Sequence, residues 1–369
     1  MSSDRQAAAW PRVCVVGPMP PPSGGMANQC EQLVRLLAGE GARVELVRNN
    51  EPYRPVWVGR LPMVRALCRL LPFVVQVLRA AGRVDLIHVL ANSGWAWHLL
   101  TAPVLLAARL HGTPVIVNYR GGGADTFLAR APRHVLWSLR RVALRVTPSA
   151  FLQRVFAKYG LAAEIVPNIV DLARFTPAPP RDFGDAPHLV VARNLEPIYD
   201  MPTALRAFVT VRQAFGNATL TIAGMGPEHG ALEALANELG VAPWVRFAGR
   251  IDNADMPRLY SDADCVLNPS TVDNMPISLL EAFASGVPVV STNAGGIPDL
   301  VEHGTSGLLV PVGDAAAMGR ETVRILQDAE LRQRLVQAGL AQALNYAWPA
   351  VRERWRTAYW RAVASGGKA

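Results

Sequence analysis

The sequence predicts an α/β fold with two Rossmann-like domains. Its first part begins with a short apolar strand at 12–17, a loop that ends in two glycines, a helix and a second strand at 43–47, which is how a Rossmann-like unit opens. A second series of alternating strands and helices starts at 188–192. Between the two series lies a stretch rich in proline and glycine, which is typical of a linker.

The remaining strands and the boundaries follow from short apolar runs between turn residues. Further strands are expected at 84–90, 114–119, 145–148 and 164–167 in the first domain, and at 220–224, 245–249, 265–268 and 287–290 in the second. We therefore place the first domain at 1–175, the linker at 176–186, the second domain at 187–347 and a closing helix at 348–364. A chain of 369 residues is long enough for each domain to bury its own core.

Composition and charge narrow the class of protein. Half of the residues are hydrophobic and 18% are charged, as in globular proteins. The start of the chain lacks the apolar run of a signal peptide, and the longest apolar stretches are far shorter than the ~20 residues that span a bilayer. The four cysteines have neither metal nor disulfide spacing, which favours a reducing cytoplasm. A net charge of +8 fits an acidic substrate or an anionic membrane, and the lack of a nucleic-acid motif makes nucleic acid the least favoured partner.

The stretch 268–314 carries the candidate chemistry. A loop that contains Asp273 leads into a helix whose first turn suits Pro276 and which holds Glu281. Free amides at the start of this helix, and those of the later turn Gly295-Gly296, suit a phosphate, while the two carboxylates suit hydroxyl groups. The stretch therefore predicts a site for a sugar nucleotide. The alternative is that Asp273 caps the helix and Glu281 lies on the surface.

The same stretch resembles the nucleotide-sugar site of family-4 glycosyltransferases, which are retaining enzymes with the GT-B fold. Their two acidic residues separated by seven positions are matched by Asp273 and Glu281, with Asp in place of the usual first Glu. A Pro-Val-Val strand follows from Pro288, and a Gly-Gly-Ile-Pro turn follows from Gly295. The resemblance covers most of the chain and implies two domains that face a cleft, with 348–369 packing back on the first domain.

The resemblance also implies an activity and a set of roles. It implies transfer of a sugar, with retention and without a metal or other cofactor, from a nucleoside diphosphate sugar to a glycan or lipid-linked acceptor in polysaccharide or glycoconjugate biosynthesis. Arg193 would stabilise the leaving diphosphate, Asp273 would accept from a hydroxyl of the transferred sugar, and Glu281 would accept from the ribose. The second domain would hold the donor and the first the acceptor. The implied donor-binding residues are Gly24, Gly25, Asn274, Met275, Pro276, Ile277, Glu281, Gly295 and Gly296.

The chain departs from the family pattern at the diphosphate. The family places a lysine five or six residues after the arginine, where this chain has Ile198 or Tyr199. Arg120 follows an expected strand at a position where the family usually carries a histidine beside the reacting carbon. We expect Arg120 to be a further catalytic residue that supplies the missing charge. The alternative is that it pairs with a carboxylate.

Other short motifs carry weaker signals. In the resembling family the loop that ends in Gly24 and Gly25 closes on the diphosphate, although a plain tight turn is the alternative. No G-x-G-x-x-G is present, and Gly224-x-Gly226 lacks the third glycine, which disfavours a dehydrogenase. The Asp-Ala-Asp run at 262–264 mimics a metal-binding motif, but its place on a helix-to-strand turn favours capping, so no metal site is predicted.

The segment 52–84 contains six arginines and no acidic residue. On a helical wheel, Arg65, Arg69, Arg79 and Arg83 share one side, and Pro72 is expected to interrupt or kink the helix. A basic amphipathic helix can lie on an anionic membrane, so we expect a cytoplasmic protein that can bind the inner face of the membrane peripherally. The alternative is a crossover helix with a solvated arginine face.

Two other functions remain open from the sequence. One is a nucleotide-sugar-binding protein with weak or lost catalysis, which Tyr199 and Asp200 favour because they replace the expected Lys and Gly. The other is a GT-B sugar-nucleotide epimerase, which would turn over its substrate without an acceptor.

Overall fold

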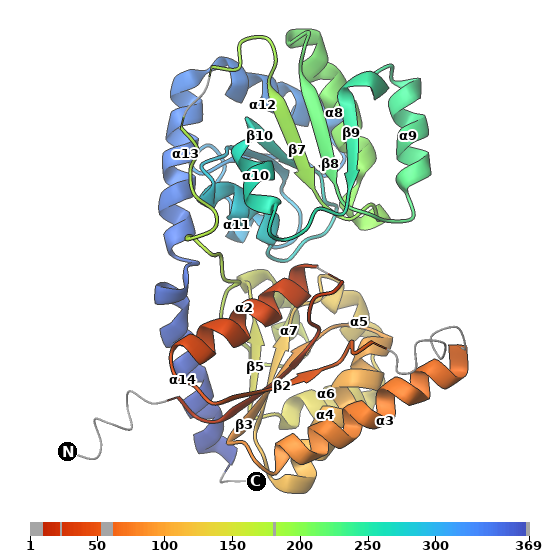
Figure 1. The fold of residues 1–369 in the computed structure, drawn as a ribbon, viewed down its shortest axis with the longest axis vertical. Helices are drawn as coiled ribbons and strands as arrows, with labels where there is room; N and C mark the ends of the chain where they lie inside the picture. Colours follow the sequence, from red (N-terminus) through yellow and green to blue (C-terminus); the bar gives the residue numbers. More distant parts are fainter. Residues whose placement is uncertain (1–9, 23, 53–61, 180–181, 367–369) are drawn as a thin grey trace, which may run out of the picture. The chain divides into compact units, whose positions relative to one another are not determined.

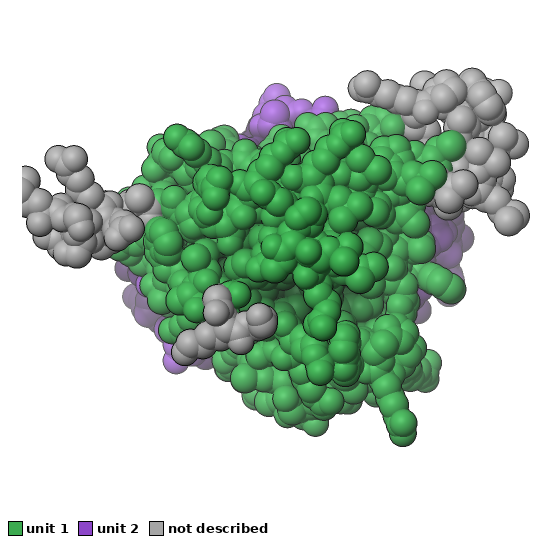
Figure 2. Space-filling view, turned by 90° about the horizontal axis from the view of Figure 1, so that it is seen from below, with its two compact units in different colours: residues 1–169, 351–369 green, residues 170–350 purple. Residues whose placement is uncertain are grey.

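The computed structural model describes residues 10–22, 24–52, 62–179 and 182–366, except for the side chains of 62–67. The chain divides into two compact units (Figure 2). Unit 1 comprises residues 1–169 and 351–369, and unit 2 comprises residues 170–350. The boundary between them falls after Ile169, so the stretch 170–175 that the sequence assigned to the first domain, and the expected linker at 176–186, both belong to unit 2.

Unit 1 is built on one parallel sheet with the strand order β2-β1-β3-β4-β5-β6 (Figure 1). Its strands are β1 (Val13–Gly17), β2 (Val44–Arg48), β3 (Leu86–Ala91), β4 (Val115–Tyr119), β5 (Leu144–Thr147) and β6 (Glu164–Ile165). Its helices are α2 (Gly25–Gly39), α3 (Pro62–Ala81), the π-helix η2 (Trp97–Thr101), α4 (Ala102–His111), α5 (Ala124–Arg130), α6 (Arg133–Arg141), α7 (Ala150–Lys158) and most of α14 (Trp348–Gly366).

Unit 2 repeats this architecture with the strand order β12-β11-β10-β7-β8-β9. Its strands are β7 (His188–Ala192), β8 (Thr219–Ala223), β9 (Val245–Gly249), β10 (Cys265–Asn268), β11 (Val289–Thr292) and β12 (Leu308–Val310). Its helices are α8 (Met201–Ala214), α9 (His229–Glu238), α10 (Met256–Ser261), α11 (Ile277–Ala284), α12 (Ala315–Gln327) and α13 (Ala329–Leu344), with short 3₁₀ turns η3 (Pro197–Tyr199), η4 (Ala242–Trp244) and η5 (Ile297–Asp299). Two six-stranded parallel sheets confirm the predicted pair of Rossmann-like domains.

The strands are short apolar runs because helices cover both faces of each sheet. The central strands β1, β3, β4 and β10 are buried along their whole length, as expected for parallel sheets. In unit 2 the two faces form separate hydrophobic clusters, one of which contains Leu189 and Val191 and the other Val190. Alternate residues of a single strand thus serve opposite sides of the sheet.

Each sheet has one point at which the order of its strands reverses. In unit 2 the strand that starts the unit, β7, lies between β8 and β10, and in unit 1 the first strand, β1, lies between β2 and β3. Open α/β sheets bind ligands outside the carboxyl ends of the strands at such a switch point. The residues that follow β7 and β10 in unit 2, and those that follow β1 and β3 in unit 1, are therefore the first places to look for a site.

The closing helix α14 packs on unit 1, as predicted. His88, buried in the middle of β3, accepts or donates a hydrogen bond of 2.8 Å through Nδ1 with the hydroxyl of Tyr359. Trp355 stacks on the same imidazole at 4.6 Å between ring centroids. Burial lowers the pKa of His88 to about 3, so the ring stays neutral at ordinary pH.

One local expectation is narrowed and one needs correction. Helix α3 is a single helix from Pro62 to Ala81, so of the two outcomes expected at Pro72, an interruption or a kink, the interruption does not occur. The strand expected at 287–290 begins two residues later, because the amides of Gly286 and Val287 donate to the carbonyls of Phe283 and Ala282 and thereby end α11. Gly286 adopts the left-handed conformation (φ +69°) that this helix end requires.

Candidate functional site

Arg193 lies at the switch point of unit 2, directly after β7. Its Nε donates to Oδ1 of Asn268, the last residue of the neighbouring strand β10, at 2.9 Å. Its Nη2 donates to Oδ2 of Asp273 at 2.6 Å. The two side chains are only 13% and 14% exposed, so this ion pair is largely shielded from water. The structure thus brings together two of the predicted catalytic residues.

The loop that carries Asp273 is fixed by further hydrogen bonds. Oδ1 of Asp273 accepts from the amide of Asn274 at 2.8 Å, and its main-chain carbonyl accepts from the amide of Gly296 at 2.8 Å. A side chain on Gly295 would place its Cβ 2.1 Å from the same carbonyl. The predicted glycine turn therefore packs directly against the Asp273 loop, and the amide of Gly296 is bound within the protein.

Glu281 lies one helical turn into α11 and is half-buried. The hydroxyl of Tyr260, a buried residue of α10, donates to Oε2 of Glu281 at 3.0 Å. Burial raises the pKa of Glu281 to about 7, and the Tyr260 hydrogen bond and the charges of Arg174 and Arg193 act against this rise. Because this pKa lies near neutrality, the charge of Glu281 responds to small changes of pH.

The start of α11 fits the predicted phosphate contacts only in part. Pro276 is the residue before the helix rather than part of its first turn, and Ile277 is the first helical residue. The amide of Leu279 donates to the carbonyl of Pro276 at 3.2 Å, and no side chain caps this helix start, which leaves the amides of Ile277 and Ser278 for a ligand. Asn274 and Met275, which the sequence also assigned to the donor, are buried in the loop that precedes it.

Tyr199 occupies the place at which a lysine was expected. The guanidinium carbon of Arg193 lies 5.3 Å from the centre of its ring, within the range of a cation–π contact. Burial raises the pKa of this tyrosine, so its hydroxyl stays protonated at ordinary pH. The carbonyl of Ile198 accepts from both the amide and the hydroxyl of Thr271, at 2.9 and 3.0 Å, and thereby joins the Tyr199 turn to the Asp273 loop.

The two glycines at 224 and 226 have a packing role. A Cβ on Gly224 would lie 1.8 Å from the carbonyl oxygen of Arg193, and a Cβ on Gly226 would lie 2.2 Å from that of Leu195. The loop after β8 therefore lies directly against the loop after β7. This contact explains the Gly-x-Gly pattern without a dinucleotide.

In unit 1, Arg120 directly follows β4 and is half-buried. Its guanidinium donates to the side-chain oxygen of Asn168, which is a neutral acceptor. Among the described residues, Arg120 therefore pairs with an amide and not with the carboxylate that the sequence left open as an alternative. Burial lowers the pKa of Arg120 to about 10, which still leaves it protonated at neutral pH. A Cβ on the next residue, Gly121, would lie 2.3 Å from Oδ1 of Asn92, so the Asn92 side chain would have to move to admit it.

Gly24 and Gly25 lie at the exposed start of α2. Gly24 precedes the helix in an extended conformation, and its carbonyl accepts from the amide of Asn28 at 2.9 Å. A Cβ on Gly24 would meet no other atom within 4 Å, so packing within unit 1 does not require a glycine there. The first turn of α2 contains no acidic residue and no capping side chain, which leaves its amides open to an anion.

The Asp-Ala-Asp run at 262–264 serves a structural purpose. Oδ2 of Asp264 accepts from the amide of His188 at 2.7 Å, and the carbonyl of Asp262 hydrogen-bonds with Nδ1 of the same histidine at 2.8 Å. The run therefore fixes the start of β7 against β10. Within the described ranges, no three or more His, Cys, Asp or Glu side chains come together as a metal site would need.

Sequence reasoning missed three residues of this site. Asn268 and Ser270, whose hydroxyl donates to Asn268 Oδ1 at 2.9 Å, follow or end a buried strand, and a polar residue at that place is a recognisable signal. Tyr260 gives no such signal, because a buried tyrosine in a short helix is as typical of a core as of a site.

Both domains match models of known protein families. Residues 186–328 match the model of glycosyl transferases group 1, and residues 23–174 match that of glycosyltransferase family 4. A D-inositol 3-phosphate glycosyltransferase of Salinispora arenicola is 33% identical over 79% of this chain and 72% of its own. A GDP-mannose-dependent alpha-(1-6)-phosphatidylinositol monomannoside mannosyltransferase of Mycobacterium tuberculosis is 29% identical over 93% and 94%.

Solved structures share the fold over nearly the whole chain. The sucrose-phosphate synthase of Thermosynechococcus elongatus superposes with a TM-score of 0.75 at 19% identity, over 96% of this chain and 100% of its own. An Anabaena protein crystallised with UDP-glucose gives a TM-score of 0.70 at 19% identity, over 93% and 97%. At this identity the likeness concerns the fold alone.

Proposed function

The chain belongs to the family-4 glycosyltransferases and has their GT-B fold, and from this premise we propose that it transfers a sugar, with retention, from a nucleoside diphosphate sugar to a glycan or lipid-linked acceptor. Two similar relatives are named for reactions on inositol 3-phosphate and on a phosphatidylinositol mannoside, the second with GDP-mannose as donor. The observation that carries the proposal is the shielded Arg193–Asp273 pair at the switch point of unit 2, with Glu281 near it.

We assign the donor to unit 2, around Arg193. Two of its nitrogens are held by Asn268 and Asp273, and this fixes the direction of the guanidinium before any ligand arrives. Nη1 makes no hydrogen bond to any described residue and is left for the departing diphosphate. A preorganised donor at the site where charge develops is usually the largest single catalytic contribution. Asp273 then has two roles, to orient Arg193 and to accept from a hydroxyl of the transferred sugar.

Glu281 is assigned to the ribose of the donor. Tyr260 holds one of its oxygens, so the other can accept from the ribose hydroxyls. The open amides at the start of α11, after Asn274 and Met275, are assigned to the diphosphate, together with the amide of Gly295, since that of Gly296 bonds to Asp273. Gly24 and Gly25, at the open start of α2, stay predicted donor contacts. Charge for the leaving group then comes from arginine and main-chain amides, and we propose a reaction that uses no metal or other cofactor.

The missing lysine is one of the points at which this chain differs from the family pattern. Arg120 keeps its charge without a carboxylate partner among the described residues, which supports a share in the stabilisation of the leaving diphosphate. Tyr199 also favours a second candidate, a donor-binding protein with weak or lost catalysis, because its ring offers no positive charge. Detection of turnover separates the two.

Donor identity is tested by thermal shift with UDP-, GDP- and ADP-sugars on the wild type and on Glu281→Ala. A ligand at ~100 times its Kd adds about 2.7 kcal/mol of stability, which is easily measured. We expect one class of donor to raise the melting temperature of the wild type, and the variant to lose on the order of 10-fold to 100-fold in affinity. A folded Glu281→Ala protein that binds the donor as well as the wild type would exclude the ribose assignment.

We also propose peripheral binding to an anionic membrane. No helix in the described ranges is both long and apolar enough to cross a bilayer. Helix α3 exposes Leu71 and Val75, and the helix that packs on it, α4, exposes Leu106 and Leu110. Arginines such as Arg79 and Arg83 are exposed on or next to α3, and apolar side chains among cations are typical of an interfacial surface. Arg65, the first arginine of the predicted stripe, lies outside the described side chains.

The membrane proposal is tested by co-sedimentation with anionic vesicles. Each arginine near the surface contributes about 1 kcal/mol, so Arg79→Gln with Arg83→Gln should weaken binding clearly, and added salt should weaken it in the wild type. The control is Arg246→Gln, an exposed arginine of unit 2. Equal sedimentation of the double variant and the wild type would assign these arginines to solvent.

A further inference from the structure

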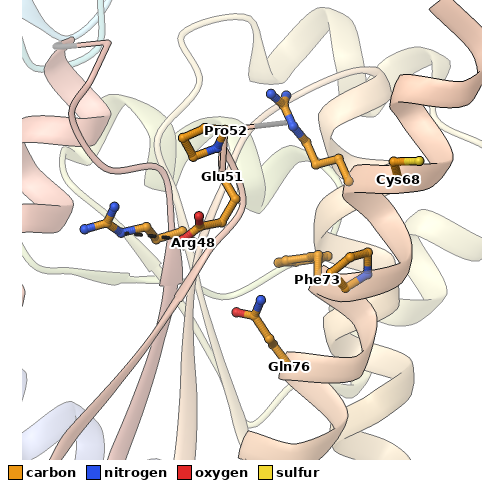
Figure 3. A pocket seen from close by; sticks show the side chains of 8 residues that line it. Arg48, Glu51, Pro52, Cys68, Phe73 and Gln76 are labelled. Atoms are coloured by element: carbon orange, nitrogen blue, oxygen red, sulfur yellow. Dashed lines mark ion pairs between the residues drawn. The ribbon is translucent and has the colours of Figure 1, made fainter. Parts of the chain in front are cut away.

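Unit 1 contains a pocket of about 400 Å³ between the end of β2 and helix α3 (Figure 3). Arg48, Glu51 and Pro52 line it from the segment that ends and follows β2. Phe73 and Gln76 project toward this segment from α3, where Arg69 and Pro72 also line the pocket (Figure 3). Its volume lies at the lower end of the range of small-molecule sites, roughly 300–1,000 Å³.

The pocket explains the position of one of the four arginines, Arg65, Arg69, Arg79 and Arg83, that were predicted to share one side of the helix. Arg69 and Gln76 are seven residues apart and share one side of α3, and the structure directs that side to the pocket. Arg79 lies on the same helix but is exposed and does not line the pocket. The sequence offered a membrane surface or a solvated helix face for these side chains, and the structure adds, for Arg69 and Gln76, a place in the lining of the pocket.

The pocket lies at the edge of the sheet where parallel sheets bind ligands. Arg48 is the last residue of β2, and the next residues attach this segment to the glycine loop that follows β1. The amide of Asn49 donates to the carbonyl of Gly17 at 3.2 Å, and the side chain of Asn50 holds the amide and the carbonyl of Met19 at 2.9 and 2.7 Å. The pocket and the loop that leads to Gly24 are therefore one connected edge of unit 1.

A second observation relates the pocket to Arg120. Arg48 ends β2 and Arg120 follows β4, and in this parallel sheet both strands end at the same edge, with β1 and β3 between them. A ligand in the pocket would occupy the side of unit 1 on which the proposed catalytic arginine lies.

The lining of the pocket suits a ligand that has an anionic group together with hydroxyl or apolar parts. Arg48 and Arg69 bring two positive charges, and Glu51, at 3.9 Å from Arg48, brings one negative charge. Guanidinium groups match the geometry of phosphate and bind it with two hydrogen bonds at once. Gln76 offers a donor and an acceptor for a hydroxyl, and Phe73 and Pro72 offer an apolar wall.

We propose that this pocket is the acceptor subsite for a phosphate group, held between Arg48 and Arg69 while the hydroxyl-bearing part of the acceptor extends along the sheet edge toward Arg120. The inference rests on the proposed function, because it names the class of acceptor that unit 1 would hold. It selects phosphorylated acceptors over neutral glycans. The phosphate can belong to a soluble phosphate ester or to a lipid headgroup.

Calorimetric titration of the full-length protein with glycerol phosphate tests the subsite, with glycerol as the neutral control. We expect Arg48→Gln and Arg69→Gln each to weaken binding about 10-fold or more. Arg79→Gln, on the same helix but outside the pocket, should bind like the wild type. Glu51→Gln removes the negative charge and should strengthen binding roughly 2-fold to 5-fold. Damage to the fold cannot produce that gain.

Binding that does not change in Arg48→Gln, Arg69→Gln and Glu51→Gln, or that falls equally in Arg79→Gln, overturns the subsite. Glycerol phosphate could instead bind at the donor site. In that case Arg193→Gln would weaken its binding, and Arg48→Gln and Arg69→Gln would not. Titration with a short-chain, monomeric phosphatidylglycerol distinguishes a soluble phosphate ester from a lipid headgroup. If this lipid binds more tightly than glycerol phosphate and depends on the same arginines, the acceptor is a lipid. We expect the pocket variants to bind the donor like the wild type in the thermal-shift assay. If the wild type itself binds no donor, that result counts against the proposed function and not against the pocket.

Discussion

Arg193 in unit 2 and Arg120 in unit 1 are the two proposed catalytic arginines, and they have different surroundings. Each directly follows a buried parallel strand, β7 in unit 2 and β4 in unit 1. Arg193 is held by a carboxylate and an amide, whereas Arg120 is held by an amide. Arg193 also lies at the switch point of its sheet, while β4 is one strand away from the switch point of unit 1.

We propose that the two units make different contributions to one reaction. The carboxylate of Asp273 fixes Arg193 and balances its charge, so this arginine is oriented in the absence of ligand. Arg120 keeps a positive charge that no carboxylate of the described residues balances, so it can attract an anionic ligand. We infer that Arg193 provides most of the stabilisation of the diphosphate and that Arg120 adds to it.

The largest expected effect follows from removal of each arginine. Arg193→Ala should lower kcat on the order of 100-fold or more, with a smaller change in KM, because the interaction is strongest when the leaving group carries its full charge. Arg120→Ala should lower kcat by a smaller factor, roughly 10-fold. Steady-state kinetics with the identified donor and an acceptor measure both.

The control for this pair is Arg246→Ala, which removes an exposed arginine of β9. It should leave kcat and KM unchanged. Equal losses in Arg193→Ala and Arg120→Ala would contradict the division of work, and a wild-type rate after Arg120→Ala would give that arginine a purely structural role.

The pH dependence of donor binding sharpens the assignment of unit 2. Burial raises the pKa of Glu281 to about 7, and ribose hydroxyls donate to the ionised carboxylate. Donor affinity should therefore rise roughly 10-fold between about pH 6 and about pH 8, as the ionised fraction grows. Calorimetry on the wild type and on Glu281→Gln measures this step, which the variant should lack. A step that persists in the variant would belong to another group.

The same group links pH to stability with a defined sign. Because the pKa of Glu281 is raised in the folded protein, the folded state binds its proton more tightly than the unfolded state. Its contribution to stability is therefore lost as the pH rises from the ordinary value of a glutamate toward 7. In the absence of donor, Glu281→Gln should melt higher than the wild type at about pH 8 and similarly at about pH 5. The reverse order would contradict the shift.

The smallest expected effect separates the charge of Asp273 from its hydrogen bonds. Asp273→Asn keeps the shape of the side chain and removes the charge that balances Arg193. The nucleoside diphosphate, an anion, should then bind roughly 3-fold to 10-fold more tightly, opposite in sign to the effect of Arg193→Ala. Competition against the donor measures this affinity. Weaker binding would mean that Asp273 itself orients the nucleotide.

The fold could be predicted from the sequence because it depends on repeated local patterns. Short apolar runs, glycine turns and helix ends recur with the spacing of a parallel sheet, and most strands were expected within two residues of where they lie. The differences concern the interior and the end of a helix, where local rules allow more than one outcome. Pro72 continues inside α3, and Val287 belongs to the end of α11 because its amide bonds to Ala282.

The sequence proposed the acids and arginines of the candidate site but not their pairing. Asp273 and Glu281 came from a loop that leads into a helix and from the spacing that the resembling family shows, and Arg193 came from the resemblance alone. That Arg193 pairs with Asp273, and Glu281 with Tyr260, depends on the order of strands across the sheet, which spacing along the chain does not encode. The pocket of unit 1 was hidden for the same reason, since Arg48 and Arg69 lie on different elements.

The most direct test of the central claim is an NMR time course of the wild type with its donor and no added acceptor, in which water serves as a slow acceptor. We expect release of the nucleoside diphosphate and of a sugar whose first-formed anomer has the configuration of the donor, with a much slower release by Arg193→Ala. Release of the opposite anomer would contradict retention. Conversion to a new sugar nucleotide without release would identify an epimerase, and a bound donor that never changes would identify a binding protein.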